Sequence, residues 1–422
     1  MPPITPRVRP PSAPSGGPAA AKARPRREPG TEGLRGLAAI LVLYTHLVAA
    51  STDVDPNYRI AAWFWKLDVS QGAVLLFFVL SGYVIGMTNA EPLHLASARN
   101  YYHRRLLRVV PLYLVAVLLG FASRPVDSGR TLAGNLLFLE NELPYGSWRW
   151  PLLTGNTHLW SLNYEMLFYL ACPLVWMIPR WWSAWLLGSA AAGVAAWSWG
   201  GGGAVLAAYF ASWTFWLAGY GLALAPKPEG AAARSVPWPS IALAWLAAWH
   251  LKPLWNVAHR FAFLPPAAGW MNYSFYDFIP GCLALLIAAS GRRPAIGRWL
   301  IGFAIAEPAA YSVWLVLRGR AFGSGQELDV LFAGSAAALC WWRPSARAFA
   351  GLAVVGSVSY GLYVFQRPVQ WFIRDFTWLP SGSLAAYLLR LVLALALVAA
   401  LSWFGERRFQ PWLRRRLAPP LA

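Results

Sequence analysis

This chain of 422 residues has unusually few charged residues. Asp, Glu, Lys and Arg together make up 13% of it, against about 25% in soluble globular proteins. Hydrophobic residues reach 58%, there are 26 Trp, and the mean hydropathy is +0.43. So few charges exclude an ordinary soluble domain, and Trp is enriched where a membrane meets water. The composition predicts a polytopic membrane protein whose first partner is the lipid bilayer.

Cysteine is scarce too. Cys172, Cys282 and Cys340 are scattered in apolar runs, with no paired spacing and no Cys/His cluster nearby. This pattern argues against a metal site, and we expect all three to be small buried residues. Nothing in the sequence indicates a permanently bound cofactor.

Acidic residues are outnumbered, because 36 Lys and Arg stand against 17 Asp and Glu, for a net charge of +19. Such a charge can indicate nucleic-acid binding. Here the basic residues cluster in short loops between apolar segments, which the positive-inside rule assigns to the cytoplasmic side. We therefore expect no nucleic-acid partner. The same loops could hold anionic lipid headgroups or a phosphorylated cosubstrate.

Apolar segments follow one another along the chain. They predict an all-α transmembrane bundle of about ten to twelve helices, since a crossing needs about 20 residues and the segments near 300 and 335 are short. An even number places both termini in the cytoplasm of a cell (inner or plasma) membrane. The expected parts are a disordered basic cytoplasmic tail at 1–30, a transmembrane domain at 31–408, and a basic cytoplasmic tail at 409–422.

The first apolar segment carries ionisable residues into the membrane. On an α-helix, Arg35 and His46 are about 16 Å apart along the axis and only roughly 20° apart around it, so they share a face. A histidine at that depth is costly and is expected to face the bundle interior or a wet cavity, which makes it a candidate functional residue. The alternative is a histidine whose hydrogen bonds are satisfied between helices.

The second apolar segment, LLFFVLSGYVIG, contains small residues at helical spacing. Gly82 and Gly86 are four residues apart, which favours close packing against a neighbouring helix. Ser81 is expected to hydrogen-bond to another helix rather than to act as a catalytic serine.

A cationic cluster marks the start of the third segment. Arg104, Arg105 and Arg108 either set topology and snorkel to lipid phosphate or form a phosphate clamp for a nucleotide-bearing cosubstrate. Further along, Trp160 is expected at a membrane interface, with Glu165 about one turn inside. Glu165 could cap the helix N-terminus or pair with Arg or His across the bundle.

These motifs together resemble the membrane acyltransferase family 3, multi-pass O-acyltransferases that modify bacterial glycans and some glycosylated metabolites. The likeness extends from about Glu32 to Arg408. The residues that carry it are Arg35 and His46, which have ten residues between them; 77–85 (FFVLSGYVI); Arg105, Arg108 and Pro111; Trp160, Ser161, Leu162, Glu165, Phe168 and Tyr169; 278–281 (FIPG); and Ser359, Tyr360 and Tyr363.

One residue departs from the family pattern. Gln366 stands where many members have a histidine, and glutamine can hydrogen-bond but cannot shuttle a proton at neutral pH. Gln366 lies in the late segment GSVSYGLYVFQRPV, which is too polar to face lipid and is expected to face the bundle interior.

The resemblance implies transfer of an acyl group, by default acetyl, from cytoplasmic acyl-CoA to a hydroxyl of a glycan or glycosylated metabolite. His46 would be the general base, with Glu165 orienting or polarising it, or handling the acceptor. Arg35, Arg105 and Arg108 would hold the CoA phosphates. Donors to the thioester oxygen could come from Ser81, Trp160, Asn163 or Tyr360. The expected substrate contacts are Ser81, Trp160, Tyr360 and Gln366.

Other classes stay open at this level. A transporter or flippase of a glycan or lipid-linked sugar would also bury His, Glu and Arg on membrane helices, although the inverted halves common in transporters are not visible here. Gln366, in place of the usual histidine, leaves a non-catalytic protein of the same fold as a further alternative. Within the acyltransferase interpretation, a covalent acyl-His46 intermediate also stays open.

Overall fold

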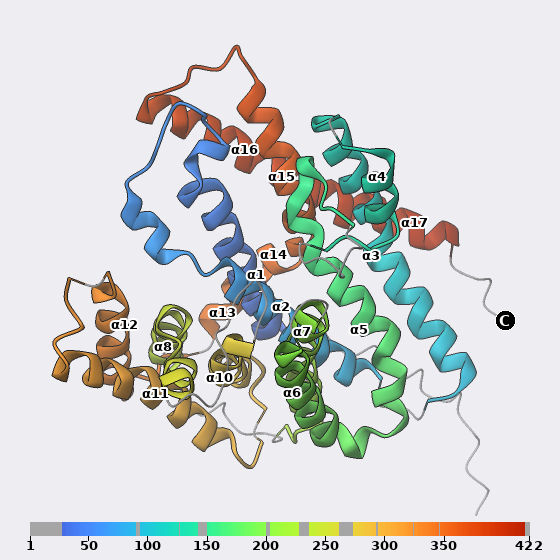
Figure 1. Cartoon of the computed structure of the whole chain (residues 1–422). Coiled ribbons are helices and arrows are strands. Elements are labelled where there is room, and N and C mark those ends of the chain that lie inside the picture. Colours follow the sequence, from blue (N-terminus) through green and yellow to red (C-terminus); the bar gives the residue numbers. More distant parts are fainter. Residues whose placement is uncertain are drawn as a thin grey trace, which may run out of the picture.

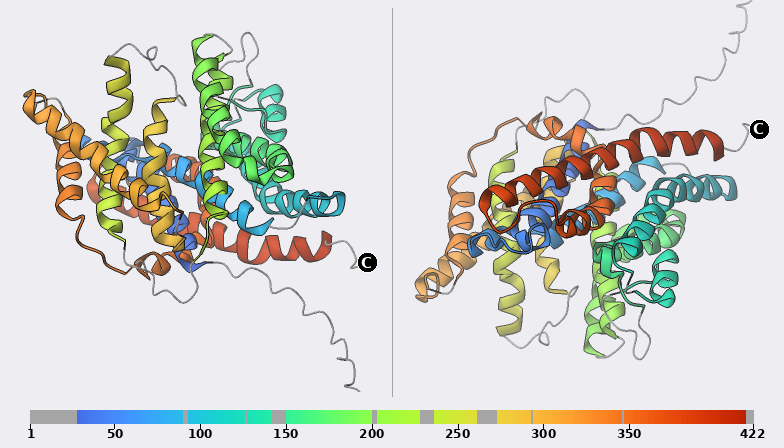
Figure 2. Two further views of the ribbon diagram at one scale, coloured as in Figure 1. Left: turned by 90° about the horizontal axis from the view of Figure 1, so that it is seen from below. Right: turned by 90° about the horizontal axis from the view of Figure 1, so that it is seen from above.

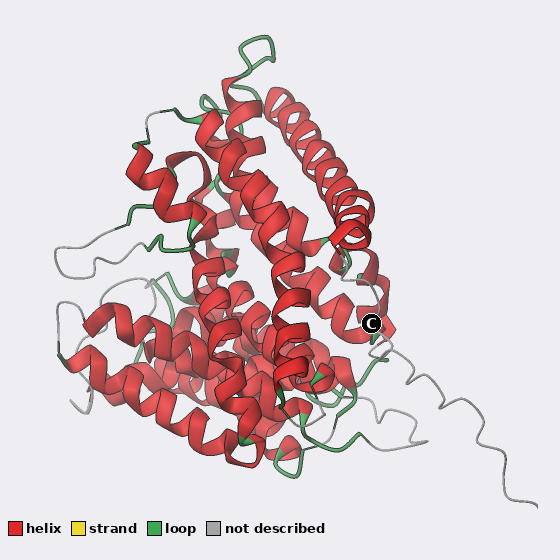
Figure 3. Cartoon of the chain, turned by 90° about the vertical axis from the view of Figure 1, so that its right-hand side faces the viewer, coloured by secondary structure: helices red, strands yellow, loops and turns green. Residues whose placement is uncertain are grey.

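The computed structural model describes residues 28–89, 93–125, 127–141, 150–199, 203–227, 236–260, 273–292, 294–323, 325–345 and 347–417. Within these ranges the regular secondary structure is helical, without strands, which confirms the predicted all-α bundle (Figure 1 and Figure 3). The predicted tail at 1–30 lies almost wholly outside the described residues.

The helices vary widely in length. They are α1 (Pro29–Leu43), α2 (Ser70–Thr88), α3 (Leu95–Ser123), α4 (Gly129–Leu136), α5 (Trp160–Met177), α6 (Trp182–Ser198), α7 (Gly203–Ala223), α8 (Trp238–Leu251), α9 (Pro253–Arg260), α10 (Ile279–Ser290), α11 (Gly297–Leu317), α12 (Glu327–Ala338), α13 (Arg347–Gly351), α14 (Ala353–Gly356), α15 (Ser359–Asp375), α16 (Leu384–Phe404) and α17 (Gln410–Leu417).

Several of these helices can cross a membrane. Six stretches of the described residues are long and apolar enough, and the count is seven if α5 and α6, which meet at a bend of 109°, form one broken span. The six are Pro29–Ala49, Ala62–Thr88, Leu95–Ser123, Gly203–Ala223, Gly297–Leu317 and Leu384–Leu417. The chain is thus a multi-pass membrane protein.

The last span includes much of the segment assigned to a C-terminal tail. A π-helix at Gly405–Phe409 joins α16 to α17, so residues 409–417 continue the helix. Both views in Figure 2 show α17 beside α3, and the Gln410 side chain donates to the carbonyl of Arg108 at 2.6 Å. This contact ties α17 to the part of α3 that carries Arg104, Arg105 and Arg108.

The centre of the bundle is built from helices that touch backbone to backbone. In Figure 1, α1 and α2 lie at the centre, with α8 and α10–α12 on one side, α3–α5 on the other and α15–α16 above. A Cβ placed on Gly82 of α2 would lie 1.9 Å from the carbonyl oxygen of Trp216 in α7, and one on Gly219 of α7 would lie 1.9 Å from that of Val79. The predicted close packing at Gly82 is therefore confirmed, and the same holds at Gly86, where a Cβ would lie 2.7 Å from Ala223.

The burial of the three cysteines differs. Cys172 and Cys282 are buried as predicted, whereas Cys340 is exposed. The prediction is wrong for Cys340 because that residue stands in the turn after α12, where the chain leaves the bundle.

Candidate active site

A pocket between five helices collects six of the ionisable and polar residues that the sequence singles out. Its empty space, counted with the solvent at its open side, is about 720 Å³. Arg35 comes from α1, Ser81 from α2, Arg105 and Arg108 from α3, Glu165 from α5 and Tyr360 from α15. We call it the arginine pocket. Three guanidinium groups share its wall with one carboxylate, so the wall carries an excess of positive charge suited to an anionic ligand.

Hydrogen bonds fix the polar wall of this pocket. Glu165 Oε1 accepts from the Ser81 hydroxyl at 2.9 Å and from the hydroxyl of Tyr169. The predicted bond from Ser81 to another helix is therefore confirmed. Tyr360 donates to the carbonyl of Val109 at 2.7 Å. Among the contacts of the described residues, none joins Glu165 to His46, and Glu165 lies in the wall of the arginine pocket.

The cationic cluster on α3 divides into two kinds of residue. Arg105 and Arg108 line the pocket, whereas the neighbouring Arg104 is exposed and does not. The guanidinium of Arg105 also lies 5.6 Å from the ring centre of Tyr169, within cation–π range. Arg35 is held by Glu32, one turn earlier on α1, at 3.1 Å. Two of the three predicted members of the cluster thus face a common cavity.

His46 lies in an unusual stretch of backbone beyond the arginine pocket. The helix α1 continues as a π-helix over Tyr44–Ala49, and such segments are rare and often occur at functional sites. The His46 ring faces the ring of His158, with centroids 3.7 Å apart and planes tilted by 32°. His158 belongs to a 3₁₀-helix, Thr154–Leu159, just before α5.

His158 was not among the residues selected from the sequence. It directly precedes the Leu-Trp-Ser-Leu stretch that was selected, but its spacing gives no sign of a partner more than a hundred residues earlier. Only the fold reveals the pair. Two imidazolium rings at this distance would repel each other, so the pair holds at most one positive charge.

Two hydroxyl groups link the arginine pocket to this pair. Tyr363 donates to the carbonyl of His158 at 2.5 Å, and the hydroxyl of Ser161 lies 2.7 Å from that of Tyr363. Because the Tyr363 proton is used on a carbonyl, Ser161 is the donor to Tyr363. Both side chains line the arginine pocket. The pocket residue Tyr363 is therefore in direct contact with His158, whose ring stacks against that of His46.

Two predicted substrate contacts lie outside the arginine pocket. Trp160 is 6% exposed and packs edge-on against Tyr164, with ring centres 5.6 Å apart. Its indole is packed inside the protein, and its expected place at a membrane interface stays a prediction. Gln366 is fully buried, and neither of its amide atoms has a hydrogen-bond partner among the described residues. The late polar segment thus faces the interior, as predicted.

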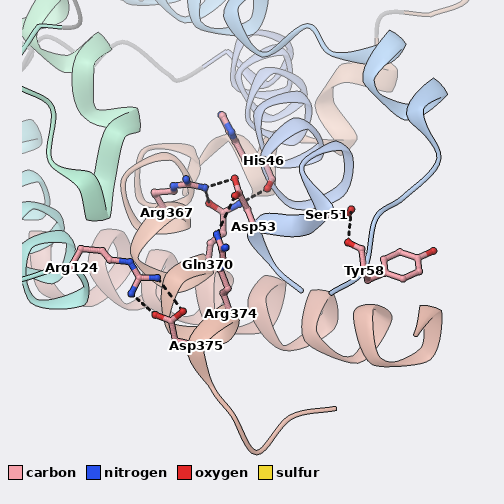
Figure 4. A network of polar contacts seen from close by, with 9 residues as sticks. All are labelled: His46, Ser51, Asp53, Tyr58, Arg124, Arg367, Gln370, Arg374 and Asp375. Atoms are coloured by element: carbon pink, nitrogen blue, oxygen red, sulfur yellow. Dashed lines mark hydrogen bonds and ion pairs between the residues drawn. The ribbon is translucent and has the colours of Figure 1, made fainter. Parts of the chain in front are cut away.

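A network of charged residues lies at the far end of α1 and α15 (Figure 4). Arg367 pairs with Asp53 at 2.5 Å, and Arg374 approaches the same carboxylate at 3.7 Å. Gln370 donates to the backbone carbonyl of His46. Arg124 pairs with Asp375. The network therefore anchors the helix that carries Arg367 to the backbone of His46.

Glu140 is a buried carboxyl group near the arginine pocket. The Tyr113 hydroxyl lies 2.5 Å from the carbonyl oxygen of Asn135 and 2.9 Å from Glu140 Oε1. The hydroxyl has one proton for two acceptors, and a protonated Glu140, which can itself donate to the Tyr113 oxygen, satisfies both contacts. Burial raises the pKa of Glu140 well above its usual range. The contacts and the raised pKa both favour the neutral form of Glu140.

This neutral acid predicts a pH-dependent stability. A carboxyl with a raised folded-state pKa stabilises fully below its unfolded-state pKa, and that contribution is lost as pH rises through the folded-state value. Glu140→Gln keeps a donor for Tyr113 and has no charge to bury. We expect thermal unfolding of the wild type in detergent to shift to lower temperature between pH 5 and pH 9, and that of the variant to shift less. Equal pH slopes for the two proteins would contradict a protonated Glu140.

Comparisons with known proteins bear on the identity of the chain. A family model described as an acyltransferase domain, of acyltransferase family 3, matches residues 29–321. Acyltransferase MdmB from Streptomyces mycarofaciens is 29% identical over 175 residues, which cover 37% of this chain and 43% of that relative. No solved structure matches. Because the family model covers well over half of the 422 residues, the chain belongs to acyltransferase family 3.

Proposed function

We propose that this protein is a membrane O-acyltransferase that moves an acyl group, acetyl by preference, from acyl-CoA to a hydroxyl of a glycan or glycosylated metabolite. The observation that carries the proposal is the arrangement along α1, where the arginine pocket is linked through Ser161 and Tyr363 to the imidazole pair of His46 and His158. Arginines that suit phosphates lie at one end, and the imidazole pair lies at the other. On an ideal helix the eleven residues from Arg35 to His46 span about 16 Å, room for an extended pantetheine arm between phosphates and thioester.

The proposed roles follow from these positions. Arg35, Arg105 and Arg108 bind the CoA phosphates, and Arg is well suited to this because its planar fork matches phosphate oxygens. His46 takes the proton from the acceptor hydroxyl as that oxygen attacks the thioester. The neutral ring of His158 then lies against the imidazolium of His46 and stabilises it as a π face. Glu165 holds Ser81 and Tyr169 in place in the pocket wall.

A labelling experiment tests this function. Membranes that contain the protein, and matched membranes that lack it, are incubated with radiolabelled acetyl-CoA and glycans of the source cell as acceptors. Label that enters a carbohydrate fraction only when the protein is present supports the proposal, and the labelled fraction identifies the acceptor class. If no label transfers from acetyl-CoA or from longer acyl-CoAs, while the protein is shown to be inserted, the proposal is wrong.

The difference between the pocket residue Arg105 and the exposed Arg104 leads to a prediction for the binding of acetyl-CoA. Arg105→Gln removes a charged contact, which typically contributes about 1.5–3 kcal/mol, so we expect KM for acetyl-CoA to rise roughly 10- to 100-fold with little change in kcat. Arg104→Gln, next to it but exposed, should behave like the wild type. With S-acetyl-pantetheine, which lacks the nucleotide phosphates, both variants should match the wild type. Equal effects of the two substitutions on KM would argue for a general surface-charge effect instead.

A further inference from the structure

Arg367 has one feature that its ion pair does not explain. Its Nη1 atom meets Asp53 at 2.5 Å and Gln370 at 3.4 Å. Its Nε atom is buried and has no hydrogen-bond acceptor among the described residues. An N–H group buried without a partner is costly in any protein. The guanidinium of Arg367 is therefore oriented by its partners and keeps one buried N–H that can donate to a bound ligand.

The position of Arg367 supplies a candidate explanation. Tyr363, Gln366, Arg367 and Gln370 lie three or four residues apart and so share one face of α15. Tyr363 touches His158, and Gln370 touches the backbone of His46. The charge of Arg367 acts electrostatically on both His46 and His158. Arg367 therefore stands on the helix face that borders the imidazole pair.

We propose that Arg367 is a catalytic residue of the transfer reaction, and that its Nε–H donates to the thioester oxygen as negative charge develops there. This inference rests on the proposed acyltransferase function. Arg35, Arg105 and Arg108 cannot serve this purpose while they hold phosphates in the arginine pocket. A preorganised donor aimed at the developing oxyanion is commonly the largest single contribution to such catalysis.

The step balances as follows. The acceptor hydroxyl gives its proton to His46 while its oxygen bonds to the thioester carbon. The π electrons of the C=O bond move to the oxygen, which Arg367 holds as an oxyanion. The C=O bond then re-forms, the C–S bond breaks, and the CoA thiolate leaves. The thiolate takes the proton from His46, which restores the neutral base, and no oxidant or reductant is needed.

Asp53 and Trp371 give this arginine its fixed orientation. Asp53 holds one end of the guanidinium, and Trp371 lies beneath it, with 4.7 Å between the Arg367 guanidinium carbon and the ring centre. The same two groups hold Arg374, at 3.7 Å from Asp53 and 4.9 Å from the Trp371 ring centre. Arg374 therefore shares the structural environment of Arg367 but stands about two turns further along α15, which makes it a matched control.

The test compares Arg367→Gln with Arg374→Gln in purified, lipid-reconstituted protein, with the acceptor fraction found by labelling. We expect Arg367→Gln to lower kcat about 100- to 1,000-fold, the usual cost of one oxyanion donor. The affinity for dethia-acetyl-CoA, a ketone analogue with CH₂ in place of sulfur, should stay within twofold, because binding in the ground state does not use this donor. Arg374→Gln should keep kcat within threefold.

Several outcomes would overturn the inference. An unchanged kcat for Arg367→Gln would do so, and so would an effect of this substitution on KM alone. An equal loss of kcat for Arg374→Gln would show that the network has a structural role. If Arg367→Gln does not fold, Arg367→Lys keeps a cation for Asp53 but lacks the Nε donor, and should still lose more than tenfold in kcat. A full rate for the lysine variant would also reject the proposal. Failure of the wild type to transfer label would instead reject the proposed function itself.

Discussion

A His46→Gln protein is expected to lose about 100- to 10,000-fold in the rate of acyl transfer, the usual contribution of a positioned general base. Glutamine fills a similar space and can hydrogen-bond, but it cannot take up a proton at neutral pH. The arginine pocket does not include His46, so equilibrium dialysis should show unchanged CoA binding. The loss should therefore fall on kcat.

His250→Gln is the control for this experiment. His250 is also a histidine on an apolar helix, but its ring is held by Asp329 at 2.9 Å and by the carbonyl of Asp68 at 3.0 Å, and it does not line the arginine pocket. We expect it to transfer acyl groups at close to the wild-type rate. If His46→Gln, inserted in equal amount, retained full activity, another group would have to act as the base. Acid-quenched protein that carries label on His46 would instead show an acyl-enzyme route.

The contact between α2 and α7 gives the largest expected effect on folding. Gly82→Val should yield little or no folded protein, because the new Cβ would lie 1.9 Å from the carbonyl oxygen of Trp216 and the helices would have to separate. Overpacking usually costs about 1–3 kcal/mol, and the cost here should reach or exceed that range because backbone cannot rotate away. Gly82→Ala should fold less stably than the wild type.

Gly302→Ala is the matched control. A Cβ at Gly302, in α11, meets no atom within 4 Å, and alanine is favoured over glycine within a helix by roughly 1 kcal/mol. Size-exclusion chromatography and thermal unfolding in detergent should therefore rank Gly302→Ala at or above the wild type. A stable, monodisperse Gly82→Val protein would mean that the two helices do not pack as closely as described.

The sequence was informative where polar residues interrupt apolar helices. Arg35, Ser81 and Glu165 lie on three different helices, and each must turn inward because lipid cannot satisfy it. This rule predicts that they face the interior, and they meet in one pocket. The rule cannot say which of them meet, because rotation and neighbours of a helix depend on packing. For that reason the sequence leaves open whether Glu165 caps its helix or pairs with Arg or His across the bundle, whereas in the structure it bonds to Ser81 and Tyr169.

That rule does not extend to His158 and Arg367. His158 lies in a short 3₁₀-helix with a kink at Asn156, whose path depends on contacts with α3 and α15. The sequence identifies Arg367 only as one residue of the polar segment GSVSYGLYVFQRPV. Its relation to His46 depends on the turn at Asp53, which no periodicity predicts. Spacing along one helix is readable from sequence, whereas contacts between a helix and an irregular segment are not.

The π-helix that carries His46 has a consequence for how this protein tolerates changes in length. A π turn holds one more residue than the α-helical ladder around it, as if one residue had been inserted. Deleting Tyr44 or Thr45 from this segment would let it relax to a regular helix, and the residues after it would stay close to their present places. His46 would keep its chemistry, but its side chain would turn by up to about 100° and leave the ring of His158. In this stretch the number of residues is therefore as constrained as their identity.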